Sequence, residues 1–307
     1  MSCPSTLLLL LAALFWGLSG GLGGVLIDRG WDPLVISFYR GAVGLLAVLC
    51  WVAVHPKRSG LGRAPLWFWS VLAGLGVTGN FALYFVSVEH GSLAVGATLM
   101  YCAPVFVYLV SFSFGLEPPT AGKWVAMALV LVGILLLVEV HRLDAAAITP
   151  VALAAGLLSG ACYALFIFGF KYASAHGNAA AILSIAFLVL VSVLAWPSDH
   201  LQLRSAWTSP DWPLFLAIGV LGAGLSFVLY VIGLRHTPPP VASVVAMIEP
   251  VTASLFAFAV LGERLTVVQW SGVALILSTV TVLSMISRDH RRPRRLRLRR
   301  HRTDRQQ

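Results

Sequence analysis

Ten long apolar segments occupy most of this 307-residue chain. A helix needs about 20 apolar residues to cross the roughly 30 Å hydrocarbon core of a bilayer, because each residue adds about 1.5 Å. The segments are continuously apolar and lack the alternating pattern of membrane β-barrel strands. The sequence therefore predicts an all-α polytopic membrane protein with ten transmembrane helices, at 5–27, 33–54, 66–88, 91–115, 121–138, 150–170, 177–196, 212–234, 238–261 and 265–286.

Composition excludes soluble classes of protein. Apolar residues make up 59% of the chain and charged residues 11%, whereas a soluble domain carries about 25% charged residues. A soluble fold of this length has no core large enough for so much apolar surface. The four cysteines are scattered without a CxxC motif, and three of them lie in apolar segments, so neither disulfides nor a metal site nor another cofactor is predicted.

The net charge of +9 is concentrated at one end of the chain. Ten of the 21 Lys and Arg residues lie between Arg288 and Arg305, directly after the last apolar segment. A basic tail in this position is typical of a cytoplasmic anchor on anionic lipid headgroups and not of nucleic-acid binding. With ten spans, the side holding both termini carries 16 of the Lys and Arg residues and the other side carries four, which places both ends in the cytoplasm.

An internal repeat relates the two halves of the sequence. A shift of 146 residues superimposes many rare residue types, which chance does not easily align at one offset. The matches include Gly76 with Gly222, Phe81 with Phe227, Tyr84 with Tyr230, His90 with His236, Pro104 with Pro250, Glu117 with Glu263, Thr120 with Thr266 and Trp124 with Trp270. The chain is therefore predicted to contain two homologous units of five spans each.

The odd number of spans in each unit has a topological consequence. A unit that crosses five times leaves its copy starting from the opposite face, so the two copies are related by an axis in the membrane plane. Inverted repeats with a site between them are typical of secondary transporters. We predict a first repeat at 5–138, a linker at 139–149, a second repeat at 150–286 and a basic cytoplasmic tail at 287–307. The alternative is a duplication that only built a stable bundle.

Several stretches resemble the EamA-type transporters of the drug/metabolite transporter superfamily. They are Phe38-Tyr39-Arg40, the segment from Tyr101-Cys102-Ala103-Pro104-Val105 to Glu117, and the segment from Glu249-Pro250-Val251 to Leu261-Gly262-Glu263. Trp16-Gly17 in the first span and Tyr163 in the second half fit the same pattern. The paired spacing from Pro to Glu in both halves makes the resemblance specific.

This resemblance implies a ten-helix carrier that moves small metabolites, often outward, by alternating access. Members of the family include amino acid exporters, and relatives move nucleotide sugars or sugar phosphates. Two departures weaken the transfer of a particular substrate. Glu117 is followed by Pro118-Pro119, where a basic or polar residue is commoner, and Asp28-Arg29 replaces the basic residue that often ends the first span.

Two charged residues lie well inside predicted spans. Arg40 is about 10 Å from the end of its segment, and an unpaired charge there costs at least about 2.5–3.5 kcal/mol. It either faces a polar cavity and attracts a substrate carboxylate or phosphate, or has a structural role, bonded to helix carbonyls or extended to the outer surface. Glu249 lies near the middle of segment 238–261. It is either a proton-coupling group, a substrate contact, a partner of Arg40 or a neutral acid with a structural hydrogen bond.

Pro104 and Pro250 occupy matching positions in the fourth and ninth segments. Each removes a helical hydrogen bond, so each is a candidate hinge beside a central site or a simple packing kink. Polar and aromatic residues inside the spans are candidates for lining a substrate cavity. Together with Arg40 they are Trp16, Asn80, Tyr84, Tyr101, Tyr163, Ser226 and Tyr230.

The predicted function is a secondary transporter that moves a small metabolite, such as an amino acid-like solute, out across the inner membrane. No GxxxxGK[ST] loop occurs, so ATP does not drive the protein directly. A passive channel is the main alternative, although a channel usually has a ring of like polar groups. Gly17-Leu18-Ser19-Gly20-Gly21 matches the GxSxG motif of hydrolases, but no histidine lies deep in a span to act as its base.

Overall fold

The computed structural model describes residues 4–54, 59–142 and 148–289, and every regular element within these ranges is a helix. The basic tail from residue 290 and the middle of the predicted linker lie outside the described residues. The elements that build the bundle are α1 (Pro4–Asp28), α2 (Pro33–Val54), α3 (Ala64–Glu89), α4 (Leu93–Met100), α5 (Ala103–Ser113), α6 (Ala121–Leu137), α7 (Pro150–Ala173), α8 (Ala179–Leu194), α9 (His200–Ser205), α10 (Trp212–Gly219), η4 (Val220–Leu225), α11 (Ser226–Arg235), α12 (Pro239–Ala246), α13 (Ile248–Phe256), η5 (Ala257–Leu261) and α14 (Val267–Asp289).

Eight helical stretches among the described residues are long and apolar enough to cross a membrane. The apolar helices α6 and α8 are shorter, with 17 and 16 residues, which corresponds to about 24–26 Å. Side chains cap the N-termini of several helices by accepting hydrogen bonds from backbone amides of the first turn. Thr120, Thr149 and Asn178 each accept a hydrogen bond from the amide three residues later. The described chain is thus an all-helical, multi-span membrane protein.

Two segments that the sequence predicts as continuous helices are each divided in two. Segment 91–115 is interrupted at Tyr101 and Cys102, between α4 and α5, and segment 238–261 is interrupted at Met247, between α12 and α13. Buried Pro104 and Pro250 lie just after these breaks. Proline donates no backbone hydrogen bond, and its ring clashes with the carbonyl four residues earlier. The two breaks are equivalent, because the 146-residue shift takes Tyr101 to Met247.

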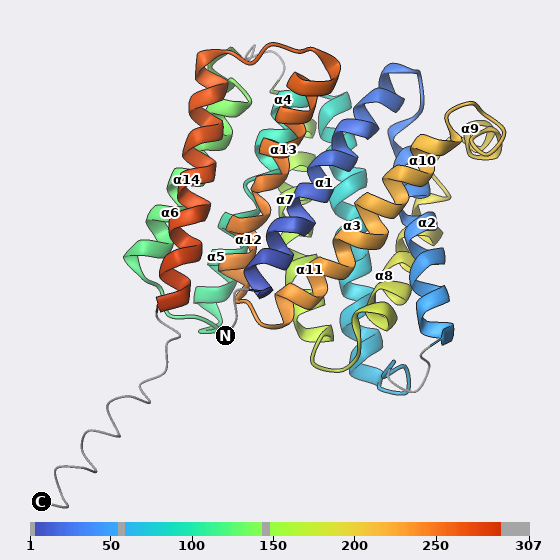
Figure 1. The fold of residues 1–307 in the computed structure, drawn as a ribbon, viewed down its shortest axis with the longest axis horizontal. Coiled ribbons are helices and arrows are strands. Elements are labelled where there is room, and N and C mark those ends of the chain that lie inside the picture. Colours follow the sequence, from blue (N-terminus) through green and yellow to red (C-terminus); the bar gives the residue numbers. More distant parts are fainter. Residues whose placement is uncertain (1–3, 55–58, 143–147, 290–307) are drawn as a thin grey trace, which may run out of the picture.

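Helices of the first half pack mainly against helices of the second half, in reciprocal pairs. The third span of each half packs on the first span of the other, α3 on α7 and α11 on α1. Both parts of each fourth span do the same, because α4 and α5 pack on α7 while α12 and α13 pack on α1. Two further pairs join equivalent helices, α2 with α8 and α6 with α14. Helices α6 and α14 lie side by side at one edge in Figure 1. Exchanging the two halves therefore maps this set of contacts onto itself.

Glycines allow the close approach between the two halves. A Cβ atom at Gly76 of α3 would lie 2.7 Å from the backbone nitrogen of Phe166 in α7. At the equivalent Gly222 of η4, a Cβ atom would lie 2.4 Å from Oγ of Ser19 in α1. Real Cβ atoms do not come this close to other heavy atoms, so both helix crossings need a residue without a side chain.

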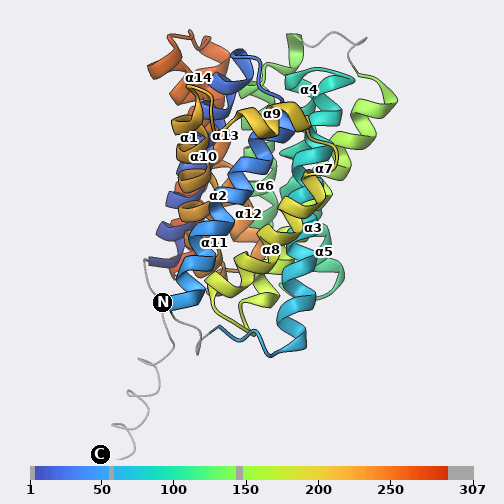
Figure 2. The ribbon, with the colours of Figure 1, turned by 90° about the vertical axis from the view of Figure 1, so that its right-hand side faces the viewer.

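The connecting loops form contacts at both ends of the bundle. Figures 1 and 2 show the start of α1, the end of α14 and the loop at 59–63 at one end, and α9 at the other. At the first end, the Asn178 amide donates to the Ser59 carbonyl at 3.4 Å. At the end with α9, the Asp211 carboxylate accepts hydrogen bonds from Arg29 and, at 2.8 Å, from Trp31 Nε1. Hydrogen bonds from Trp31 and Arg29 hold the pKa of Asp211 below its ordinary value, so this contact stays intact at neutral pH.

Candidate functional site

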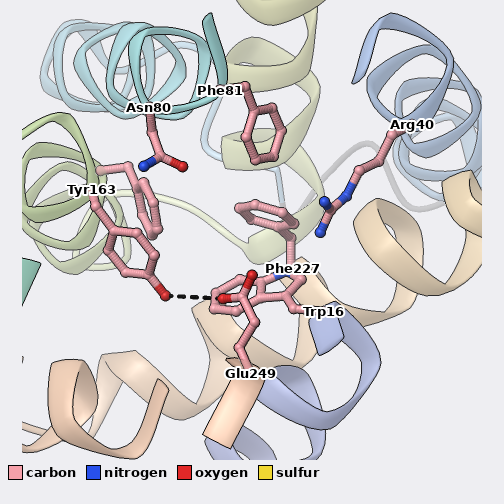
Figure 3. A pocket seen from close by; sticks show the side chains of 8 residues that line it. Trp16, Arg40, Asn80, Phe81, Tyr163, Phe227 and Glu249 are labelled. Atoms are coloured by element: carbon pink, nitrogen blue, oxygen red, sulfur yellow. Dashed lines mark hydrogen bonds between the residues drawn. The ribbon is translucent and has the colours of Figure 1, made fainter. Parts of the chain in front are cut away.

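A small pocket lies between the two halves of the chain, inside the bundle. Its volume is about 20 Å³, and about 10–15 Å³ is enough for one water molecule. Figure 3 shows side chains from six different elements pointing into this space. They are Trp16 of α1, Arg40 of α2, Asn80 and Phe81 of α3, Tyr163 and Phe166 of α7, Phe227 of α11 and Glu249 of α13. A pocket of this volume is too small for a solute as large as an amino acid.

The guanidinium of Arg40 is held in the pocket wall by the opposite half of the chain. Its Nε atom donates to the carbonyl oxygen of Gly222 at 3.0 Å, and its Cζ atom lies 5.1 Å from the centroid of the Phe81 ring. Gly222 belongs to the π-helical η4, whereas its repeat counterpart Gly76 lies in the continuous helix α3. Helical irregularities of this kind are frequent at functional sites. The local π-helix therefore places a backbone acceptor beside the Arg40 side chain.

Glu249 lies just after the break at Met247 and reaches the same pocket. Its Oε2 atom accepts a long hydrogen bond of 3.5 Å from the Tyr163 hydroxyl. Three ion pairs within 4.0 Å occur among the described residues, and none of them joins Arg40 to Glu249. Within those residues no three His, Cys, Asp or Glu side chains are grouped as metal ligands. The site thus offers one cation and one acid that are not paired with each other.

Asn80 adds a neutral polar group to the opposite wall. Its Nδ2 atom donates to the carbonyl oxygen and to the Oγ atom of Ser159 in α7, both at 3.1 Å. The Ser159 hydroxyl donates in turn to the backbone carbonyl of Asn80 at 2.8 Å. Both side chains are buried, with exposed fractions of 2% for Asn80 and 0% for Ser159. These bonds fix α3 to α7 and leave the amide oxygen of Asn80 pointing toward the pocket (Figure 3).

Aromatic rings fill the remaining wall. The ring of Trp16 lies 4.9 Å from that of Phe227, and the ring of Tyr163 lies 4.4 Å from that of Phe166, measured between centroids. We did not predict Phe81, Phe166 or Phe227 as cavity residues from the sequence. Phe81 and Phe227 are repeat counterparts, and Phe166 lies one helical turn after Tyr163. Repeat equivalence and helical spacing were the available signals for these three rings.

Four further candidates do not line this pocket, although they lie in the same core. Tyr230 packs on Trp16 with ring centroids 4.7 Å apart, and its hydroxyl is buried without a hydrogen-bond partner among the described residues. Oγ of Ser226 is buried in the same way. Tyr84 is half-buried on α3, and Tyr101 lies buried at the break between α4 and α5.

A substitution at Gly222 tests how closely η4 packs against Ser19 and Arg40. A Cβ atom there would lie 2.4 Å from Oγ of Ser19 and 2.7 Å from Nε of Arg40, so we expect Gly222→Ala to lower the free energy of unfolding by about 1–3 kcal/mol. Gly224 is the matched control in the same π-helical segment, because its Cβ atom would lie at least 3.5 Å from any neighbour. Gly224→Ala should be neutral or stabilising in thermal unfolding of the purified protein. Equal destabilisation by both variants would contradict this assignment.

The sequence model of the EamA-like transporter family matches residues 4–139 and again residues 148–285. The chain is 28% identical to the uncharacterized transporter YwfM of Bacillus subtilis (strain 168), over 92% of this chain and 94% of that protein. It is 30% identical to the pseudopaline exporter CntI of Pseudomonas aeruginosa (strain UCBPP-PA14), over 61% of this chain and 63% of CntI. A solved structure titled "Crystal structure of protein" superimposes with a TM-score of 0.76 and 16% identity, covering 95% of this chain and all of the other.

Proposed function

This chain belongs to the EamA-like transporter family, and from that premise we propose that it carries a small zwitterionic metabolite, such as an amino acid, across the cytoplasmic membrane by alternating access. Its relatives are named as transporters, and the chain is accordingly a membrane transporter and not an enzyme. The substrate, the direction of transport and the coupling ion are further parts of this proposal.

The observation that carries this proposal is the unpaired arginine and glutamate in one aromatic pocket. Unpaired charges inside a membrane are expensive and are typical of substrate and ion pathways. Arg40 attracts a carboxylate, and Glu249 in its ionised form attracts an ammonium group. The rings of Trp16, Phe166 and Phe227 accommodate an apolar body between the two charges. An amino acid combines all three features.

The proposed architecture is ten transmembrane helices in two inverted repeats, at 5–138 and 150–286. The 146-residue repeat, the two matches of the family model and the reciprocal helix packing support this arrangement. The pocket contains repeat counterparts from both halves, Phe81 and Phe227, as expected for a site on the axis between them. The breaks before Pro104 and Pro250 are the proposed hinges, since a pocket of about 20 Å³ must widen before an amino acid can bind.

We place both termini in the cytoplasm, with the basic tail on anionic lipid headgroups. The excess of Lys and Arg on the side of the termini supports this orientation. YicL of Salmonella typhimurium, 23% identical over 91% of this chain, is named as an inner membrane transporter, which supports the location. The name of CntI as an exporter supports transport out of the cell.

We further propose that a proton gradient drives transport through Glu249, which binds either a proton or the substrate ammonium. The sequence contains no GxxxxGK[ST] loop for direct use of ATP. A passive channel is less compatible with the pocket, because channels form rings of like polar groups around a pore, whereas this site has one arginine and one glutamate on different walls.

Counterflow in proteoliposomes tests the proposed function. Vesicles that contain purified protein and unlabelled leucine should take up labelled leucine faster than vesicles without internal leucine. A carrier accelerates in this way because the loaded site returns faster than the empty one, whereas a channel does not. Uptake should also saturate with leucine concentration. Uptake that is linear with concentration and insensitive to internal leucine would contradict the carrier.

A further inference from the structure

The carboxamide of Asn80 has only one chemically sensible orientation. One of its two terminal atoms contacts the backbone carbonyl of Ser159, and a backbone carbonyl can only accept a hydrogen bond. The amide nitrogen must therefore face α7, and the amide oxygen must face the pocket, as Figure 3 shows. The Ser159 hydroxyl reinforces this orientation, because it accepts from Nδ2 and donates to the Asn80 backbone. The pocket thus contains a fixed, neutral acceptor in addition to the Glu249 carboxylate.

This acceptor has no counterpart in the other half of the protein. The repeat equivalent of Asn80 is Ser226, and the residue equivalent to Ser159 is Ala13, which has no polar side-chain atom. In agreement, the buried Oγ atom of Ser226 has no hydrogen-bond partner among the described residues. The bonded pair is therefore a feature of the α3–α7 side alone. It makes the pocket asymmetric, with acceptors at Asn80 and Glu249 and a cation at Arg40.

We propose that the Asn80 amide oxygen and the Glu249 carboxylate together bind a primary ammonium group of the substrate, and that Ser159 is a positioning residue for Asn80. This inference rests on the proposed function. A primary ammonium has three N–H donors, so it can bond to both acceptors at once. A quaternary ammonium has the same charge but no N–H donor, and it leaves the Asn80 oxygen unpaired in a desolvated site.

The aromatic rings of the pocket do not make this distinction by themselves. Trp16, Phe166 and Phe227 attract any cation through their π-faces, whether or not the cation carries N–H groups. Glu249 likewise attracts either cation by charge, although it accepts a hydrogen bond only from the primary ammonium. Asn80 adds an acceptor that contributes nothing to the binding of a trimethylated amine, so it increases the selection of a primary amine. The inferred substrate class is a carboxylate that carries a primary amine, not a betaine.

Competition in the leucine counterflow assay tests this inference with defined probes. Unlabelled leucine, N,N,N-trimethylleucine and 4-methylpentanoate are compared as inhibitors of labelled leucine uptake. In the wild type, leucine should inhibit at concentrations about 10- to 100-fold lower than the trimethylated form, because that form leaves a buried acceptor unpaired. Asn80→Leu keeps the size of the side chain but removes the acceptor. It should lower this ratio by about fivefold or more and raise the half-saturating leucine concentration with little change in maximal rate.

Ser159→Ala separates positioning from packing. The backbone carbonyl of Ser159 remains, so the ratio should fall only partly, and Ser159→Thr should restore it by returning the hydroxyl. Ser226→Ala, at the repeat counterpart of Asn80, should keep the wild-type ratio. Each ratio is measured within one variant, so it does not depend on how much protein folds.

The outcomes distinguish this inference from the function on which it rests. Leucine counterflow in which the trimethylated form competes equally well would overturn the inference alone, as would a wild-type ratio in Asn80→Leu. Absence of leucine counterflow in the wild type would overturn the proposed function and this inference with it.

Discussion

Glu249→Gln should lose proton-driven transport and retain exchange of substrate for substrate. A pH difference of one unit stores about 1.4 kcal/mol per proton, which supports about tenfold accumulation when one proton is exchanged per substrate. We expect wild-type proteoliposomes to reach such accumulation and Glu249→Gln to reach none. Glutamine cannot carry a proton, but its carbonyl oxygen still accepts a hydrogen bond from the substrate. Counterflow should therefore persist, at a higher half-saturating concentration.

The matched control is Glu263→Gln, because Glu263 is an exposed glutamate near the end of the ninth span. It should leave both accumulation and counterflow unchanged. Accumulation that follows the pH gradient in Glu249→Gln as it does in the wild type would remove the coupling role. Loss of both activities in a variant that folds normally would instead assign Glu249 to substrate binding alone.

Arg40→Met should have the largest effect on substrate affinity. Removing one partner of a buried, hydrogen-bonded charge pair typically costs about 2–4 kcal/mol, which corresponds to an increase of about 30- to 700-fold in the half-saturating concentration. The effect should depend on the substrate carboxylate. In the wild type, leucine should compete far better than leucinamide, which lacks that carboxylate. In Arg40→Met the two should compete about equally, within about threefold.

Lys123→Met provides the control for removing a cation from a span. Lys123 pairs with Glu117 at 2.9 Å and lies in the first turn of α6, away from the pocket lining. This variant should keep the preference for leucine over leucinamide. If Arg40→Met also kept that preference, Arg40 would have only the structural role shown by its bond to Gly222.

Much of the fold could be predicted from hydropathy and the internal repeat. The helical class and the family follow from the apolar segments and from motifs such as Glu249-Pro250-Val251. The breaks at Tyr101 and Met247 could not be located, because a run of apolar residues has no polarity contrast that marks an interruption. Pro104 and Pro250 indicated irregular helices, but each break begins before its proline. The π-helix around Gly222 had no sequence signal, since glycine-rich packing is common in membrane spans.

The polar part of the site was more predictable than its aromatic part. Trp16, Arg40, Asn80, Tyr163 and Glu249 were candidates because polar groups inside spans are rare, and all five line the same pocket. Phenylalanines have no such contrast with their surroundings, so cavity and core rings look alike in sequence. The four candidates outside the lining illustrate the opposite problem. Polarity indicates that a residue is unusual, but only the helix orientation decides which face it occupies.

The inverted arrangement of the two repeats is the central claim, and accessibility labelling in intact cells tests it most directly. Single cysteines would replace the exposed Arg63 and Arg204 in a variant without the four native cysteines. A membrane-impermeant thiol reagent should label Arg204→Cys from outside and should reach Arg63→Cys only after the membrane is permeabilised. Labelling of both positions from the same side would contradict the inverted repeats and the transporter mechanism built on them.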